Sequence, residues 1–532
     1  MRSLTVAVGV VIAVAVCSKF SWETPVHFHD PRSHLPVHGD GRLPFQLVPV
    51  TPAPLQYAHQ PKAASPLTIS SPSPHLPDLR ETELPTSTED SVRSFDSSAE
   101  VVGCSDRSRK KPGNNCRDLY DGVLYSRSSL QRGPYAAFLQ PVKEGTHAAS
   151  LIELPSGALL MAWFSGTEGE AGVVVAVSSL PRDARQWTMP RVVSSAPQRS
   201  NQNPVLFHDA ERDVVVLMHT SQEAGRGQGT SRVVWLTSRD SGASWTPPAA
   251  HPSFPLEDGP FLKGKILIGG PNAVGNSSEV STEWLLPMYY TPTSGGLASH
   301  YCAMWRSDDH GATWKNESLM SWKGQFLAQP TVVRLHDGSL RAFFRDRKGA
   351  WIYWSDSTDD GRTWPEKHRR SKLPNNQSGI QAILLASGNL LMAFNNMKCG
   401  HDRCHRHPVS LALSEDEGLT WSHVRDIEFG GSHDDVMPLR TPPRYQRYSY
   451  PTLIQTRDQL IHVAFSYRKK AIKHVVVDEE WIKYGGTIGI FKGSKDHAQN
   501  VHHHELTTKH YDHHHHHEPF VIKHHERTHP TS

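Results

Sequence analysis

The sequence predicts an all-β fold of the propeller type, in which several small sheets surround a central axis. A turn motif of the form Ser-x-Asp-x-Gly-x-Thr/Ser-Trp occurs four times, at residues 238–245, 307–314, 357–364 and 414–421. Each copy follows an apolar strand, as Trp351 to Trp354 precede the third copy. The copies lie about 50 to 70 residues apart, which is the length of one four-stranded blade with its loops. Repeated blades of this kind are typical of a propeller.

The chemistry of the motif indicates a structural role. In the third copy, the Asp359 carboxylate can accept backbone N–H groups within the turn, and Gly361 supplies a positive φ. Trp364 packs its indole ring beneath the turn. A fifth, degenerate copy keeps only Ser178 and Trp187. We therefore expect the repeated aspartates to stabilise the blades and not to take part in catalysis.

The start of the chain has the pattern of a secretory signal peptide, predicted over residues 1–20. Arg2 supplies the positive charge, and Leu4 to Val16 form an apolar run that ends near small residues. The run is short for a membrane span, and no later stretch is long enough to be one. The sequence thus predicts a secreted or lumenal protein without a membrane span after signal removal. An uncleaved signal anchor is the alternative.

Two further segments are predicted to be disordered extensions of the propeller. Residues 21–118 are rich in Pro, Ser and His and form a predicted stalk. Residues 496–532 form a His-rich tail, with runs at 502–504 and 513–517. These runs could bind transition metals, but they lack a ligand spacing that closes one site, so a disordered tail is favoured and no metal site is predicted. No cofactor motif occurs in the sequence, so no cofactor is predicted. The net charge of +3 does not suggest a nucleic-acid partner, and the oligomeric state is left open.

The cysteines and glycosylation sequons are consistent with secretion. Cys17 lies in the predicted signal peptide, and Cys302 is expected to be free on a strand. Two local pairs can form disulfides, Cys104 with Cys116 and Cys399 with Cys404, although the sequence does not fix the pairing. The N-glycosylation sequons begin at Asn276, Asn316 and Asn376.

The propeller itself is predicted over residues 119–495. Most blades show an apolar strand, a turn at a small or acidic residue, and a second strand. The predicted strand pairs are 150–154 with 158–163, 331–335 with 339–344, 381–385 with 390–394, and 452–455 with 460–465. A further blade carries a strand at 284–290 after a long loop.

Counting back from the hairpin turns identifies the residues that open the innermost strands. Gln329, Gly379 and Tyr450 each lie nine residues before the turn positions Gly338, Gly388 and Gln459. Asn203, which is followed by Pro204, opens another blade, and His147 lies ten residues before Gly157. The first strand of each propeller blade lines the channel, so we expect these mostly polar side chains to converge at one mouth.

The turn motif at blade spacing resembles the Asp-box (BNR) repeat, and the chain resembles the sialidase superfamily, whose fold is a six-bladed β-propeller. Sialidases bind the substrate carboxylate with three arginines and use a Tyr nucleophile, a Glu that activates it, and an Asp as acid/base. The resemblance implies that Arg345 and Arg406 bind the carboxylate and that Tyr450 is the nucleophile. Tyr448 is the reserve candidate, two residues away on the same strand face. A neutral nucleophile avoids repulsion with the sugar's own carboxylate.

The chain departs from the family pattern at three places. His147 stands where the first arginine is expected, and Gln329 stands where the activating glutamate is expected. The loop after Trp163 contains no aspartate and offers only Glu168 and Glu170, of which we favour Glu170 as the acid/base. An amide cannot take the phenol proton, and loss of a general base typically costs about 10² to 10⁴ in rate.

The functional expectation is a secreted, sialidase-like exo-glycosidase that acts on a terminal anionic sugar of a glycan. Tyr450, Gln329 and Glu170 are the candidate catalytic residues. The candidate substrate-binding residues are Arg345, Arg406, His147 and Asn203, and Arg468 or Lys263 also suit an anionic sugar. Two alternatives remain, namely a glycan-binding propeller that has lost catalysis and a polysaccharide lyase that acts on a uronate.

Overall fold

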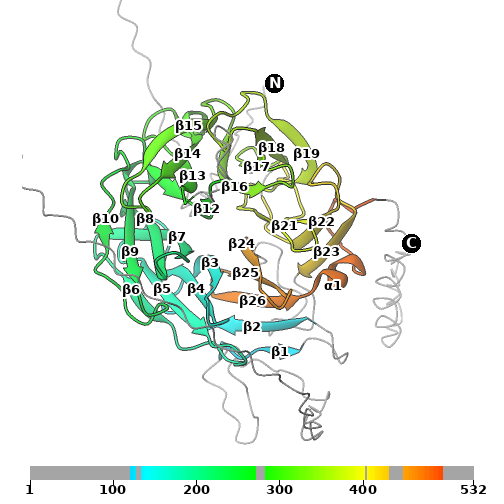
Figure 1. Cartoon of the computed structure of the whole chain (residues 1–532), viewed down its shortest axis with the longest axis horizontal. Helices are drawn as coiled ribbons and strands as arrows, with labels where there is room; N and C mark the ends of the chain where they lie inside the picture. Colours follow the sequence, from blue (N-terminus) through cyan, green and yellow to red (C-terminus); the bar gives the residue numbers. More distant parts are fainter. Residues whose placement is uncertain (1–119, 127–133, 271–281, 402–403, 430–446, 495–532) are drawn as a thin grey trace, which may run out of the picture. The chain divides into compact units, whose positions relative to one another are not determined.

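The computed structural model describes residues 120–126, 134–270, 282–401, 404–429 and 447–494. These residues all fall within one compact unit, Val92–Ser532. They form six antiparallel sheets around a central axis, as Figure 1 shows, which confirms the predicted six-bladed β-propeller. The predicted signal peptide, stalk and His-rich tail lie outside the described residues, and their boundaries stay predictions.

The first three blades follow one another along the chain. Blade 1 contains β3 (His147–Glu153), β4 (Leu159–Ser165), β5 (Val174–Leu180) and β6 (Arg191–Ser194). Blade 2 contains β7 (Arg199–Asp209), β8 (Val214–Glu223), β9 (Arg232–Ser238) and β10 (Ala249–Ala250). Blade 3 contains β11 (Pro260–Leu262), β12 (Leu267–Ile268), β13 (Trp284–Tyr290), β14 (Tyr301–Ser307) and β15 (Lys315–Ser321).

The next two blades repeat the four-stranded pattern. Blade 4 contains β16 (Leu327–Arg334), β17 (Leu340–Asp346), β18 (Trp351–Ser357) and β19 (Arg369–Pro374). Blade 5 contains β20 (Gln381–Leu384), β21 (Leu390–Asn395), β22 (Val409–Ser414) and β23 (His423–Glu428). The described helices are the 3₁₀ turns Gln228–Thr230 and Gly296–Ser299 and the short α1 (Glu479–Lys483). No helix among the described residues is long and apolar enough to cross a membrane.

Blade 6 closes the ring with strands from both ends of the propeller. Its inner strands are β24 (Tyr448–Gln455), β25 (Ile461–Tyr467) and β26 (Ala471–Val477). The outer strands β2 (Tyr135–Leu139) and β1 (Tyr125–Ser126) come from the start of the propeller, and β2 pairs antiparallel with β26. The sequence reasoning did not anticipate this closure. It leaves the inner strands of all six blades facing the centre of the ring, where β3, β7, β16 and β24 lie in Figure 1.

The repeated turns are stabilised as their chemistry predicts. In the third copy, Asp359 Oδ1 accepts hydrogen bonds from Ser357 Oγ at 2.7 Å and from the Thr363 backbone N–H at 2.9 Å. Thr363 Oγ1 donates to Asp359 Oδ2 at 2.5 Å, and the indole of Trp364 donates to the Gly361 carbonyl at 3.2 Å. The carboxylate is thus used within its own turn.

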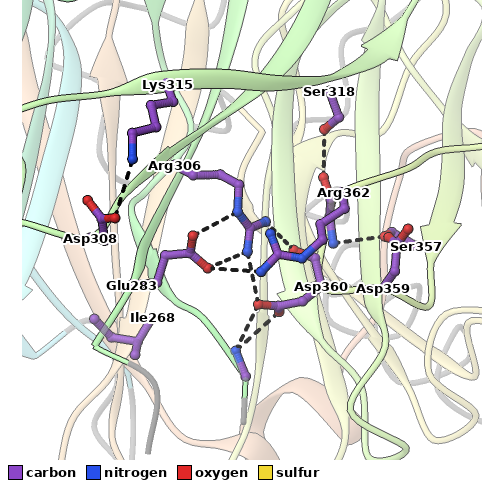
Figure 2. Close-up of polar contacts among 12 residues, drawn as sticks. Ile268, Glu283, Arg306, Asp308, Lys315, Ser318, Ser357, Asp359, Asp360 and Arg362 are labelled. Carbon is purple, nitrogen blue, oxygen red and sulfur yellow. Dashed lines mark hydrogen bonds and ion pairs between the residues drawn. The ribbon is translucent and has the colours of Figure 1, made fainter. Parts of the chain in front are cut away.

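One network links the turn of blade 4 to blade 3 (Figure 2). The buried guanidinium of Arg306 donates to both carboxylate oxygens of Glu283 and to the Asp360 backbone carbonyl. The Asp360 carboxylate accepts hydrogen bonds from Arg334 at 2.6 Å and from the Gly270 N–H at 3.1 Å. These bonds satisfy the buried charge and hold the two blades in fixed register.

Four of the inner strands contain a β-bulge with a left-handed residue. Ala148, Asn203, Gln329 and Tyr450 have φ values of 53°, 48°, 49° and 57°, and the strand register shifts at each of them. Only a few per cent of non-glycine residues adopt such a backbone, and it re-aims the side chain. The bulge thus sets how Gln329 and Tyr450 meet at the channel.

The cysteine and sequon predictions have mixed outcomes. Cys399 and Cys404 form a disulfide, and Cys302 is free and buried. Cys104, Cys116 and Asn276 lie outside the described residues. The prediction that Asn376 is a glycosylation site does not fit this fold. The Asn376 side chain is buried, and its amide donates a hydrogen bond to the His405 carbonyl.

Candidate functional site

The site is built around the phenol oxygen of Tyr450, which opens the inner strand of blade 6. Arg345 on β17 donates from Nη1 to Tyr450 Oη at 2.6 Å, and Gln329 on β16 donates from Nε2 to the same oxygen at 2.9 Å. All three side chains are buried. Two strands of blade 4 thus place two hydrogen-bond donors on one phenol of blade 6.

The orientation of the Gln329 amide follows from its other partner. Arg345 Nη1 also donates to Gln329 Oε1 at 2.8 Å, and a guanidinium can only donate. The nitrogen of the amide must therefore face Tyr450 and Tyr289, whose hydroxyl oxygen lies 3.2 Å from it. Within the described part of the chain, no recorded hydrogen bond has Tyr450 Oη as its donor. This environment favours the phenolate over the phenol.

Further cations surround the Tyr450 ring. The Arg406 guanidinium carbon lies 5.5 Å from the ring centroid and that of Arg345 lies 5.7 Å from it, while Lys263 Nζ lies 5.9 Å away. Burial alone would raise the pKa of Tyr450, but the charges of Arg345 and Arg406 outweigh it and hold that pKa below its usual value. Desolvation lowers the pKa of Lys263 to about 8, so its ammonium still exists at neutral pH.

Arg347 lies close behind this cluster. Desolvation and the neighbouring charge of Arg345 lower the pKa of Arg347 to about 10, which leaves its guanidinium charged. Its guanidinium carbon is 5.9 Å from the Tyr289 ring centroid. Arg347 directly follows the end of β17, and its charge, like that of Arg345, acts on Tyr450.

His147 lies against the nucleophile candidate. The His147 ring centroid is 4.4 Å from that of Tyr450, and its Nδ1 is 2.5 Å from Ser466 Oγ. Desolvation by burial lowers the pKa of His147 well below its usual value, so the ring is neutral at physiological pH. A neutral imidazole cannot replace the charge of an arginine, but it can position or exchange protons.

Of the two loop glutamates, Glu168 is the one whose charge acts on Tyr450 and Arg406. Glu168 Oε2 accepts a hydrogen bond from Lys469 Nζ at 2.8 Å. Desolvation would raise the pKa of Glu168, but Lys469, His147 and Arg406 lower it to about 2. Both glutamates are exposed, but Glu170, unlike Glu168, makes no side-chain hydrogen bond or ion pair among the described residues. The acid/base role of Glu170 stays a prediction, and the geometry favours Glu168.

The remaining sequence candidates have structural contacts. The Asn203 amide donates to the Leu262 carbonyl at 2.8 Å, which fixes the strand end just before Lys263. Tyr448 is buried in the core between blades 5 and 6, where its ring centroid lies 5.1 Å from that of Tyr467. The bulge at Tyr450 separates the two tyrosines, so Tyr450 is the one that meets the arginines.

Sequence reasoning missed Arg347, Lys469 and Tyr289. Arg347 could have been found from its i+2 spacing to Arg345. Lys469 and Tyr289 had no such signal, because Lys469 is in a turn of blade 6 and Tyr289 is on the second strand of blade 3. No group of three or more His, Cys, Asp or Glu side chains suited to a metal ion occurs in the described ranges.

The comparisons with known proteins agree with this architecture. The family model of BNR repeat-like domains matches residues 157–463. Anhydrosialidase of the leech Macrobdella decora is 28% identical over 248 residues, which cover 43% of this chain and 28% of the leech protein. This chain therefore matches little more than a quarter of that relative's length.

Solved structures of sialidases share the fold at low identity. The Hadza microbial sialidase Hz136 superposes with a TM-score of 0.51 at 16% identity, covering 64% of this chain and 66% of that chain. The NanB sialidase of Streptococcus pneumoniae gives a TM-score of 0.50 at 16% identity, covering 64% and 69%. The family match spans more than half of the chain, and this protein therefore belongs to the BNR repeat-like family, as a divergent member of the sialidase superfamily.

Proposed function

We propose that this protein is an exo-glycosidase that removes a terminal anionic sugar, sialic acid or a related acidic sugar, from glycans. The observation that carries the proposal is the Tyr450 phenol oxygen, which accepts hydrogen bonds from Arg345 and Gln329. The relatives whose names include sialidase activity support the substrate class. The predicted signal peptide at residues 1–20 supports action in the secretory pathway or outside the cell.

The proposed reaction uses Tyr450 as the nucleophile, in its ionised form and not as the neutral phenol that the sequence comparison favours. The charges of Arg345 and Arg406 offset the repulsion between this phenolate and the sugar carboxylate. Its phenolate oxygen attacks the anomeric carbon, the bond to the leaving-group oxygen breaks, and that oxygen takes a proton from an acid. Water then attacks the same carbon, and the bond to Tyr450 breaks to return the phenolate. The unengaged donors of Arg345 and Arg406 would hold the sugar carboxylate, because guanidinium groups match carboxylates in geometry and charge.

This mode of activation differs from proton removal by a base. Gln329 cannot accept the phenol proton in its observed orientation, so the positive charge of Arg345 and Arg406 must favour the ionised nucleophile. Glu168 is the closest candidate for the proton transfers at the leaving group and at water. Its ion pair with Lys469 keeps it ionised, so it is ready to accept a proton from water.

A glycan-binding propeller without catalysis is the second candidate. Two observations favour it, namely the amide at position 329 and the low pKa of Glu168, which leaves the leaving group without a ready proton donor at neutral pH. A polysaccharide lyase is the third candidate function, and the observation that favours it is the packing of the His147 ring against Tyr450.

The test is an assay of the purified full-length chain on a fluorogenic sialoside, beside its Tyr450→Phe variant. Release of the fluorophore by the native chain, reduced by about 10³ or more in the variant, is the expected result. Sialoside binding with no release in either protein would support the binding function instead. An absorbing unsaturated uronate product from uronate-containing glycans would support the lyase.

A further inference from the structure

We infer that the sugar bound at this site carries a second oxyanion in addition to its carboxylate. This inference rests on the proposed function, because it specifies the substrate class of the same site. It is carried by the balance of charge around Tyr450 and by the way in which one of the cations is held there.

The cluster contains more cations than its own anions neutralise. Lys263, Arg345, Arg347 and Arg406 all act electrostatically on Tyr450, and no ion pair is recorded for any of the four within the described ranges. The carboxylate that reaches them is Glu168, which has its own partner in Lys469. Even an ionised Tyr450 therefore leaves a charge of about +3 around one ring.

Such a cluster is unfavourable without a ligand. Like charges in a partly desolvated site repel one another, and each cation loses part of its hydration. The Nε atoms of Arg345 and Arg347 are buried and have no hydrogen-bond partner in the structure. Buried donors of this kind are normally satisfied, so an anionic ligand is the simplest partner for them.

One carboxylate is too small to neutralise the whole cluster. It can accept a bidentate bond from one guanidinium and a further bond from another, which would occupy Arg345 and Arg406. Arg347 and Lys263 then remain unneutralised. A second oxyanion on the ligand, such as a sulfate ester, a phosphate ester or a second carboxylate, would supply the missing charge.

The segment that carries Lys263 is held in place on both sides of this residue. The strand end before it is fixed by Asn203, and two residues later Lys265 Nζ donates to the carbonyls of Leu151 and Leu453 at 2.9 and 3.1 Å. Gly379 leaves room for Lys263, because a Cβ there would lie 3.3 Å from both Lys263 Cε and Tyr450 Cδ1. The Lys263 ammonium lies 5.9 Å from the centroid of the Tyr450 ring, so we assign the second oxyanion to Lys263.

The experiment measures the binding of free monosaccharides, which have no glycosidic bond to be cleaved, and of one linked dimer, whose cleavage during the titration is followed in parallel by product analysis. Isothermal titration calorimetry of the full chain compares N-acetylneuraminic acid with its O-sulfated form, its O-phosphorylated form and the α2,8-linked dimer. The first two dianions place the second charge on the same sugar, whereas the dimer places it on a neighbouring one. We expect at least one dianion to bind about tenfold or more tightly than the monoanion, which is the effect of one charge-assisted hydrogen bond.

Two variants of equal charge change locate the second contact. Lys263→Gln should abolish the preference for the dianion, so that this variant binds the monoanion and the dianions with similar affinity. Lys315→Gln is the control, because that lysine is largely exposed on β15 and pairs with Asp308. It should keep the full preference.

Each outcome decides the inference. Equal binding of monoanion and dianions, together with sialoside cleavage, would overturn it and leave the proposed function intact. A dianion preference that survives in Lys263→Gln would overturn the assignment to Lys263. Absence of binding by every sugar, with no cleavage, would overturn the proposed function together with the inference.

Discussion

Gln329 Nε2 donates a hydrogen bond to the Tyr450 phenol oxygen over 2.9 Å, in the place where the family resemblance leads one to expect a carboxylate that accepts. Arg345 fixes the direction of this bond by donating to the other end of the same amide. The residue at position 329 therefore donates a hydrogen bond to the phenol oxygen, whereas a carboxylate at this position would accept one from it. The first prediction tests this inversion directly.

The Gln329→Glu variant should raise the pKa of Tyr450. The new carboxylate removes one donor from the phenol oxygen and adds a negative charge beside it, and both changes favour the protonated phenol. The near-ultraviolet absorbance of tyrosinate, followed as pH rises, measures the shift, and Tyr450→Phe identifies which transition belongs to this residue. An unchanged titration would contradict the hydrogen-bond assignment. Faster sialoside hydrolysis by the variant would instead support the loss of a general base.

The Lys469→Met variant should extend activity to higher pH. Lys469 helps to hold the pKa of Glu168 at about 2, so the protonated acid exists only in strongly acidic solution. Removing the cation raises that pKa, and the alkaline fall of kcat/KM moves upward if Glu168 supplies the proton. Lys470→Met has the same charge change at an exposed neighbour and should leave the profile unchanged. Identical profiles for both variants would exclude Glu168 as the acid.

The Asp359→Ala variant should lose stability and keep its substrate affinity. Asp359 accepts bonds from Ser357 and Thr363 within its turn, and their loss should cost about 1–3 kcal/mol. Asp308→Ala, in the preceding turn motif, removes a largely exposed carboxylate and should change stability by less than about 0.5 kcal/mol. Thermal unfolding measures both. A changed KM with unchanged stability would show that the turn aspartates contribute to the site.

The hydrogen bonds of the turns and the positions of the neighbouring strands could be predicted from the sequence, because each motif makes its bonds within about eight residues. The meeting of Gln329 and Tyr450 could also be predicted, since the blade repeat gives each strand its register, whereas Arg345 was expected there from the resemblance to sialidases. Lys469 and Tyr289 could not, because their side chains meet the site only after distant blades pack. The preference for Glu168 over Glu170 likewise depends on Lys469, about 300 residues away.

The Phe138→Ala variant should destabilise the whole ring. Phe138 is buried in the core of blade 6 and lies on β2, the strand that closes the propeller, with its ring centroid 4.8 Å from that of Tyr467. A buried Phe→Ala change costs about 3–5 kcal/mol. Tyr135→Ala on the same strand is the control, because that side chain is 37% exposed. Equal melting temperatures for the two variants would contradict a closing role for β2.

The pairing of β2 with β26 also affects the order in which the blades can form during synthesis of the chain. The residues of β2 leave the ribosome more than 330 positions before those of β26, so β2 must wait for the last described strand of the propeller. A nascent chain can build its middle blades in succession, but it cannot complete the sheet that carries Tyr450 until β26 has been synthesised. Maturation of the nucleophile therefore follows the formation of the other five blades.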